Sequence, residues 1–97
     1  MFKKVNIAVQ IIPFSKEFEV YSLVDKAIEV IQHSGIKHQV CPFETVLEGE
    51  YDAIMHVLKN AQKACLDAGA DEVLVNIKIQ NRKNADVTLE DKMDKYS

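Results

Sequence analysis

The feature that most constrains the fold is a sequence pattern that occurs in both halves of the chain. The segments HSGIKHQV (33–40) and DAGADEVLV (67–75) each run from an apolar helical stripe, through a glycine, into a strand-like run. Each half therefore predicts a strand, a helix and a second strand. Two such units in series give the order βαββαβ, which is typical of a ferredoxin-like α+β sandwich with a four-stranded antiparallel sheet. Because both crossovers are expected to be right-handed, both helices should cover the same face of the sheet.

The boundaries follow from the turn and capping residues. The expected strands span residues 5–12, 37–42, 45–49 and 72–79. Pro13 is expected to close the first strand, and Ser15 to cap the first helix, with Glu17 and Glu19 in its first turn. The second helix is expected over residues 50–68.

The length of 97 residues suits one domain over residues 1–97. Within it, residues 81–97 form a loop and a C-terminal helical tail. Residues 81–86 read as a polar loop, and Thr88, with Asp91 three positions later, is expected to cap a short helix. Such a tail packs on its own sheet edge or on a neighbouring subunit, or frays.

Strand alternation leaves one sheet face without helices. The apolar residues Val5, Ile7, Val9 and Ile11 are expected on the covered face. The residues expected on the open face are Asn6, Ala8, Gln10, Ile12, Gln39, Cys41, Thr45, Leu47, Leu74, Asn76 and Lys78. About half are apolar and several are amides, so both self-association and a polar niche for an uncharged or weakly basic heterocycle are open.

The segment FETVLEGEYD (43–52) contains the densest group of polar side chains. Glu50 and Asp52 are explained by the favourable start of the second helix. Glu48 is expected to point toward the covered face or its rim, where it would pair with a lysine or with backbone, or bind a cationic ligand. Thr45, expected on the open face, could hydrogen-bond either a ligand or a neighbouring strand.

Charge and motif content argue against several function classes. The net charge is −3 and Arg82 is the one arginine, so nucleic-acid binding is not expected. Three scattered histidines and two cysteines lack metal-ligand spacing, so no metal or cofactor is expected. No nucleophile and base are brought together, which argues against an enzyme. Without a signal peptide or a long apolar run, the chain is expected to be cytoplasmic and not to bind membranes.

Four segments, VNIAVQIIP, CPFETVLEGEYDAIM, AGADEVLVNIKI and VTLEDKMDKY, together resemble the small thiamine-binding, ferredoxin-like family that was first catalogued as a conserved family of unknown function. The spacing P-x-x-T-x-x-E-G-E, here from Pro42 to Glu50, is the most specific part. The resemblance implies a cytoplasmic homo-oligomer, a dimer or tetramer assembled through its sheets. It also implies binding of thiamine or its hydroxymethylpyrimidine moiety without known chemistry.

Combining this ligand class with the expected sheet faces gives a set of ligand contacts. They are Thr45, Glu48, Gln10 and Asn76, followed by Asn6 and Lys78. Amides and a carboxylate suit an aminopyrimidine and a cationic thiazolium. The alternative is a structural or regulatory oligomeric module whose open face only makes subunit contacts and takes no small ligand. A register error of one residue would move these side chains to the opposite face.

Overall fold

The protein is described by a computed structural model that covers residues 3–96, apart from the side chain of residue 95. The elements are β1 (Lys4–Phe14), α1 (Val20–His33), β2 (Lys37–Val40), β3 (Thr45–Glu50), α2 (Tyr51–Asp67), β4 (Glu72–Gln80), α3 (Leu89–Met93) and a short 3-10 turn, η1 (Asp94–Tyr96). This is the predicted βαββαβ order followed by the predicted tail.

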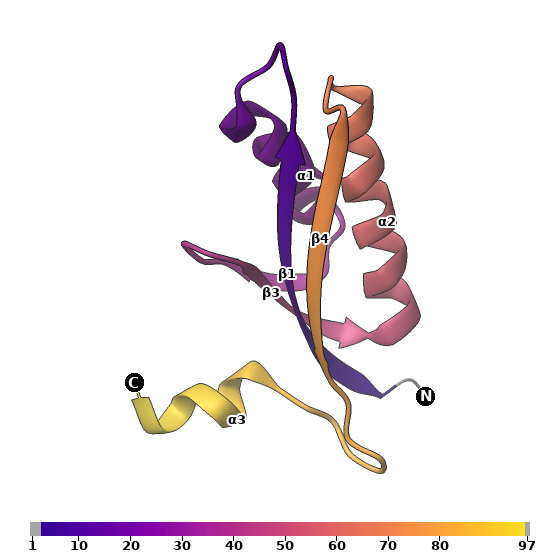
Figure 1. Ribbon diagram of the computed structural model, residues 1–97. Helices are drawn as coiled ribbons and strands as arrows, with labels where there is room; N and C mark the ends of the chain where they lie inside the picture. Colours follow the sequence, from indigo (N-terminus) through magenta and orange to yellow (C-terminus); the bar gives the residue numbers. More distant parts are fainter. Residues whose placement is uncertain (1–2, 97) are drawn as a thin grey trace.

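The four strands form one antiparallel sheet in the order β2-β3-β1-β4. Helices α1 and α2 lie side by side on one face of the sheet (Figure 1). The tail with α3 leaves the lower end of β4 and, in this view, runs below the strands. The ferredoxin-like α+β fold is therefore confirmed. Among the described residues, no helix combines the length and the apolar character needed to cross a membrane.

The core lies between the sheet and the two long helices. Val5, Ile7 and Val9 of β1 are at most 2% exposed and pack with Ile54 and Leu58 of α2. Their alternation with the more polar even-numbered positions is the reason that β1 has one buried and one open face. The expected assignment of the faces of the first strand is confirmed.

The connection from β1 to α1 differs from the expectation. Strand β1 continues through Pro13 to Phe14, and α1 begins only at Val20. Ser15 does not cap the helix, because its hydroxyl accepts from the backbone N–H groups of Glu17 and Phe18 in the intervening turn. The acidic residues of this turn therefore lie ahead of the helix and not in its first turn.

The two capping side chains near the functional segments are well defined. Glu50 is the N-cap of α2, and its carboxylate accepts from the N–H of Ala53 at 2.8 Å. Thr88 caps α3 by accepting from the N–H of Asp91 at 3.2 Å, as predicted. Both caps satisfy helix N–H groups that have no partner within their own helix.

Candidate functional site

The register of β3 reverses three of the expected face assignments. Thr45 pairs with Val9, and Leu47 with Ile7, so both lie on the helix-covered face. Glu48 pairs with Asn6 and lies on the open face. The expectation for β3 was wrong because alternation within a short strand does not identify its buried face. The fully buried side chain of Leu47 identifies the buried face of β3 in the structure, and a shift of one residue in register moves every side chain to the other face.

The structure brings two of the predicted contact residues together on the open face. Asn76 of β4 donates through its side-chain nitrogen to the side-chain oxygen of Gln10 at 3.3 Å. A few residues away, Lys78 forms an exposed ion pair with Glu44 at 3.6 Å. These polar groups already have partners within the chain, so the open face is less available to a ligand than its composition indicates.

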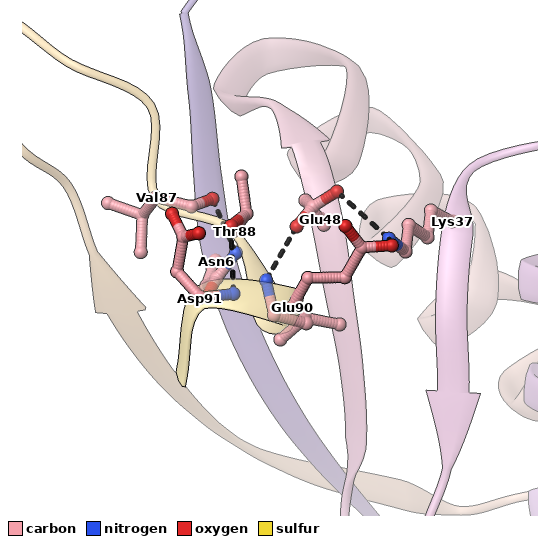
Figure 2. Close-up of polar contacts among 8 residues, drawn as sticks. Asn6, Lys37, Glu48, Val87, Thr88, Glu90 and Asp91 are labelled. Carbon is pink, nitrogen blue, oxygen red and sulfur yellow. Dashed lines mark hydrogen bonds and ion pairs between the residues drawn. The ribbon is translucent and has the colours of Figure 1, made fainter. Parts of the chain in front are cut away.

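Glu48 and Asn6 hold the C-terminal tail against the sheet (Figure 2). The Glu48 carboxylate accepts from the backbone N–H of Leu89 at 2.6 Å, and the Asn6 amide donates to the carbonyl of Val87 at 2.8 Å. Both polar residues are only 6% exposed, and Val87 is buried beside them. The sequence singled out both side chains correctly as special, but in this structure they anchor the tail.

Lys37 completes this anchor from the neighbouring strand. Its ammonium lies 3.5 Å from Glu48 and 3.6 Å from Glu90 on α3 (Figure 2). The sequence expectation that Glu48 would pair with a lysine or with backbone is met on both counts. Underneath α3, a hollow of about 240 Å³ is bordered by Asn6, Lys78 and Leu89. The side-chain oxygen of Asn6 is buried and has no hydrogen-bond partner among residues 3–96.

A second hollow, hereafter the α1 groove, lies between α1, the second half of β1 and the loop of residues 41–44. Its volume is about 250 Å³, and most of its lining is aliphatic or aromatic. Tyr21 and Phe43 border it and are 76% and 85% exposed, which is unusual for aromatic side chains in a small domain. None of the described residues that line it is a lysine, arginine or histidine, and the carboxylate of the lining residue Glu44 is paired with Lys78 at 3.6 Å.

Thr45 is the buried polar residue of the α1 groove. It is 6% exposed, and its hydroxyl makes no hydrogen bond with another described residue. An apolar hollow with a few polar groups is the usual composition of a small-molecule site. The α1 groove therefore has the character of a binding site, and the predicted candidate Thr45 lies in it.

Sequence reasoning missed the aromatic border of this groove. Tyr21 precedes the buried stripe of α1, and Phe43 follows Pro42 in a loop. An isolated aromatic in a polar loop was a usable signal, because no core position there explains it. The closeness of the two rings to Thr45 depends on how the β2–β3 hairpin turns away from β1, and no local pattern encodes that.

Comparisons with known proteins agree on one family. The family model described as "Thiamine-binding protein" matches residues 7–97. A UPF0045 protein of Clostridium perfringens is 37% identical over 91 residues, which cover 94% of this chain and 95% of that protein. A solved DUF77 domain from Bacillus cereus is 47% identical, with a TM-score of 0.96 over 98% of this chain and 91% of that one. A Thermotoga maritima structure, described as a candidate thiamine biosynthesis/salvage protein, is 28% identical, with a TM-score of 0.86 over 97% of this chain and 99% of that one.

Proposed function

The chain belongs to the thiamine-binding protein family, and we propose that it binds thiamine, or the hydroxymethylpyrimidine moiety of thiamine, in the α1 groove without catalysing a reaction. The observation that carries this proposal is the lining of the groove. It combines an apolar floor, the hydroxyl of the buried residue Thr45 and two exposed aromatic rings, and its described lining residues include no basic side chain.

This lining matches the chemistry of thiamine. The thiazolium ring carries a permanent positive charge, which is attracted to the faces of aromatic rings such as Tyr21 and Phe43. The pyrimidine is flat and largely apolar, with a few hydrogen-bonding atoms at its edge. The volume of about 250 Å³ lies just below the usual range of about 300–1,000 Å³ for ligand pockets, so a ligand of one or two rings is the appropriate size.

The hollow beneath α3 is a poorer match to a cation. It is bordered by two lysine residues, Lys78 and Lys92, and by no acidic residue among the described residues that line it. The proposal that Gln10 and Asn76 contact the ligand on the open face remains a prediction. It requires the ligand to compete with the hydrogen bond between these two amides.

The test is calorimetric titration of the full chain with thiamine and, separately, with hydroxymethylpyrimidine. The central variant is Thr45→Val, which keeps the shape of the side chain and removes its hydroxyl, with Thr45→Ser as the matched variant that restores it. We expect saturable binding that weakens about fivefold to tenfold in Thr45→Val, the equivalent of one neutral hydrogen bond. Asn76→Ala tests the open face in the same assay, because it removes the amide partner of Gln10.

Two results would contradict the proposal, the first its placement in the α1 groove and the second its ligand class. Full-strength binding in Thr45→Val together with loss in Asn76→Ala would move the site to the open face. No heat with either compound would contradict the proposed ligand class and would leave the oligomeric module as the better account of the chain.

Self-association through the open face is compatible with a ligand in the α1 groove. The open face exposes Leu74 to 50% and carries the amide pair of Gln10 and Asn76, and no long helix covers it. The α1 groove lies against α1 and the free edge of β1. We propose that subunits associate through this open face, as a homodimer or tetramer. Light scattering of Leu74→Asp tests this, since a buried charge would dissociate the assembly.

A further inference from the structure

The main chain of β1 presents an unused donor and acceptor to the α1 groove. In an antiparallel strand, the N–H and C=O of one residue point to the same side, and successive residues alternate sides. Lys4 shows which side the even-numbered residues use. Its N–H donates to Asp86 at 2.8 Å and its C=O accepts from Val87 at 3.0 Å, both in the segment that follows β4.

The other end of β1 has the same alternation. The C=O of Phe14 accepts from the N–H of Asp71, the residue before β4, at 2.7 Å. The even-numbered residues of β1 therefore direct their main-chain groups toward β4, and the odd-numbered residues direct theirs toward β3. The pairing of β1 with β3 ends where Val9 meets Thr45. Beyond that point the β2–β3 hairpin turns away from β1 (Figure 1).

Ile11 is the next odd-numbered residue, and it lines the α1 groove. Neither its N–H nor its C=O has a hydrogen-bond partner among the described residues on that side. A main-chain N–H or C=O without a hydrogen-bond partner strongly favours acquiring one. The unpaired N–H and C=O of Ile11, beside an apolar hollow, can therefore hydrogen-bond a bound ligand.

Pro13 limits what can occupy this edge. It is the following odd-numbered residue and also lines the groove, but it has no N–H to offer. Its position also explains why a proline is tolerated inside β1, since the missing N–H would point away from β4 and costs no ladder hydrogen bond. A long partner strand that paired with this edge would find a single N–H donor, that of Ile11. A small heterocyclic ligand needs only one such donor.

We propose that the main-chain N–H and C=O of Ile11 recognise the 4-aminopyrimidine edge of the ligand. The C=O accepts from the exocyclic amine, and the N–H donates to the adjacent ring nitrogen. This inference rests on the proposed function and defines the class of ligand more narrowly. The site selects heterocycles that carry an amine donor next to a ring-nitrogen acceptor, whatever is attached to the rest of the ring.

The first test uses the ligand. In the 4-oxo analogue of thiamine, the amine is replaced by a carbonyl and the adjacent ring nitrogen carries a proton, so the donor and acceptor exchange places. Calorimetry on the wild-type chain is expected to show tenfold or greater weakening relative to thiamine, since two hydrogen bonds are replaced by two mismatches. Equal affinity for the two compounds would overturn the inference while leaving the proposed function intact. Absence of binding for both would overturn the two together.

The second test uses the backbone. Ile11→Pro removes the N–H that faces the groove and, by the alternation above, leaves the β4 ladder unbroken. Ile11→Ala is the matched control, because it removes the side chain but keeps the N–H. We expect Ile11→Pro to bind thiamine at least tenfold more weakly than Ile11→Ala and to lose most of the preference for the 4-amino compound. Equal thiamine binding by the two variants would overturn the inference.

Amide exchange measured by NMR on the unmodified chain gives an answer even where Ile11→Pro does not fold. The Ile11 amide is expected to exchange faster than the amides of Gln10 and Ile12 in the free protein and to become protected when thiamine is added. An Ile11 amide already protected without ligand would show that a neighbouring chain pairs with this edge. An amide that stays unprotected at saturating thiamine would show that the ligand binds elsewhere. Either result would overturn the inference.

Discussion

Replacement of Glu48 is the sharpest test of how the tail is held. Glu48→Ala removes a carboxylate whose side chain is 4% exposed and which accepts from Leu89 at 2.6 Å. A buried hydrogen bond to a charged group contributes about 1.5–3 kcal/mol. The ion pair with the half-exposed Lys37 adds at most about 1 kcal/mol. We therefore expect Glu48→Ala to lower the free energy of unfolding by about 2–3 kcal/mol.

Glu48→Gln is the matched control. Its amide oxygen can still accept from Leu89, so only the charge and the pairing with Lys37 are lost. The expected loss is about 1 kcal/mol. For a domain of this size, 1 kcal/mol moves the melting temperature by about 4–8 °C. The two variants should therefore differ clearly in thermal and urea unfolding followed by circular dichroism.

Amide exchange locates the effect within the chain. The Leu89 amide should lose protection in Glu48→Ala and keep most of it in Glu48→Gln. Equal stability of the two variants, with Leu89 equally protected in both, would refute the assignment of Glu48 as the anchor of the tail. A large destabilisation without any change at Leu89 would indicate that Glu48 acts only through the sheet.

Three further predictions concern the β1 strand, Gly69 and Cys65. Pro13→Ala should lower the free energy of unfolding by no more than about 1 kcal/mol, measured with urea, because the unfolded chain gains freedom. Ile12→Pro should lower it by about 3 kcal/mol or more, because it removes an N–H that bonds to β4. Similar losses in the two variants would contradict the alternation assigned to β1. Gly69→Ala should cost about 2 kcal/mol, because Gly69 has φ +123° and a Cβ there would overlap the Phe18 ring. When Phe18→Ala is added to Gly69→Ala, it should relieve only the steric overlap and restore part of the lost stability. Full restoration of the stability would show that the backbone at position 69 is unstrained. Burial raises the pKa of the Cys65 thiol above its usual 9.0, so the unfolded chain loses the proton first and the stability from Cys65 falls as pH rises above that value. Its reaction with a thiol reagent should be slow in the folded protein and fast in guanidinium, and fast reaction in both would contradict the burial.

Several features of the fold were readable in the residues themselves. The apolar alternation of β1 and the glycines after each helix repeat in both halves of the chain, and they led directly to the βαββαβ order. The cap of α3 by Thr88 was likewise local, since the hydroxyl and the N–H that it satisfies are three residues apart. Local geometry determines such features because both partners are neighbours in sequence.

The candidate site could be predicted only in part. The residue types were informative, because an unpaired carboxylate near a covered face is costly and Glu48 was singled out for that reason, whereas Asn6 was named as an amide of the open face. Their partners could not be found, since Leu89 and Val87 lie 41 and 81 residues away along the chain. The predicted face of Thr45 was wrong for a related reason. The pairing of β3 with β1, and not the sequence pattern of this six-residue strand, determines which of its faces is buried.

Sequence alone thus determined the order of elements, the buried side of the longest strand and the ligand class suggested by resemblance. Only the tertiary structure decided which polar side chains are occupied and which are free. It uses Glu48 and Asn6 to hold the tail, pairs Gln10 with Asn76, and leaves the edge of β1 open at Ile11. That last property belongs to the place where β3 turns away from β1. No residue type encodes it, because every main chain carries the same donor and acceptor, and only the arrangement of neighbouring strands determines which of them remain unpaired.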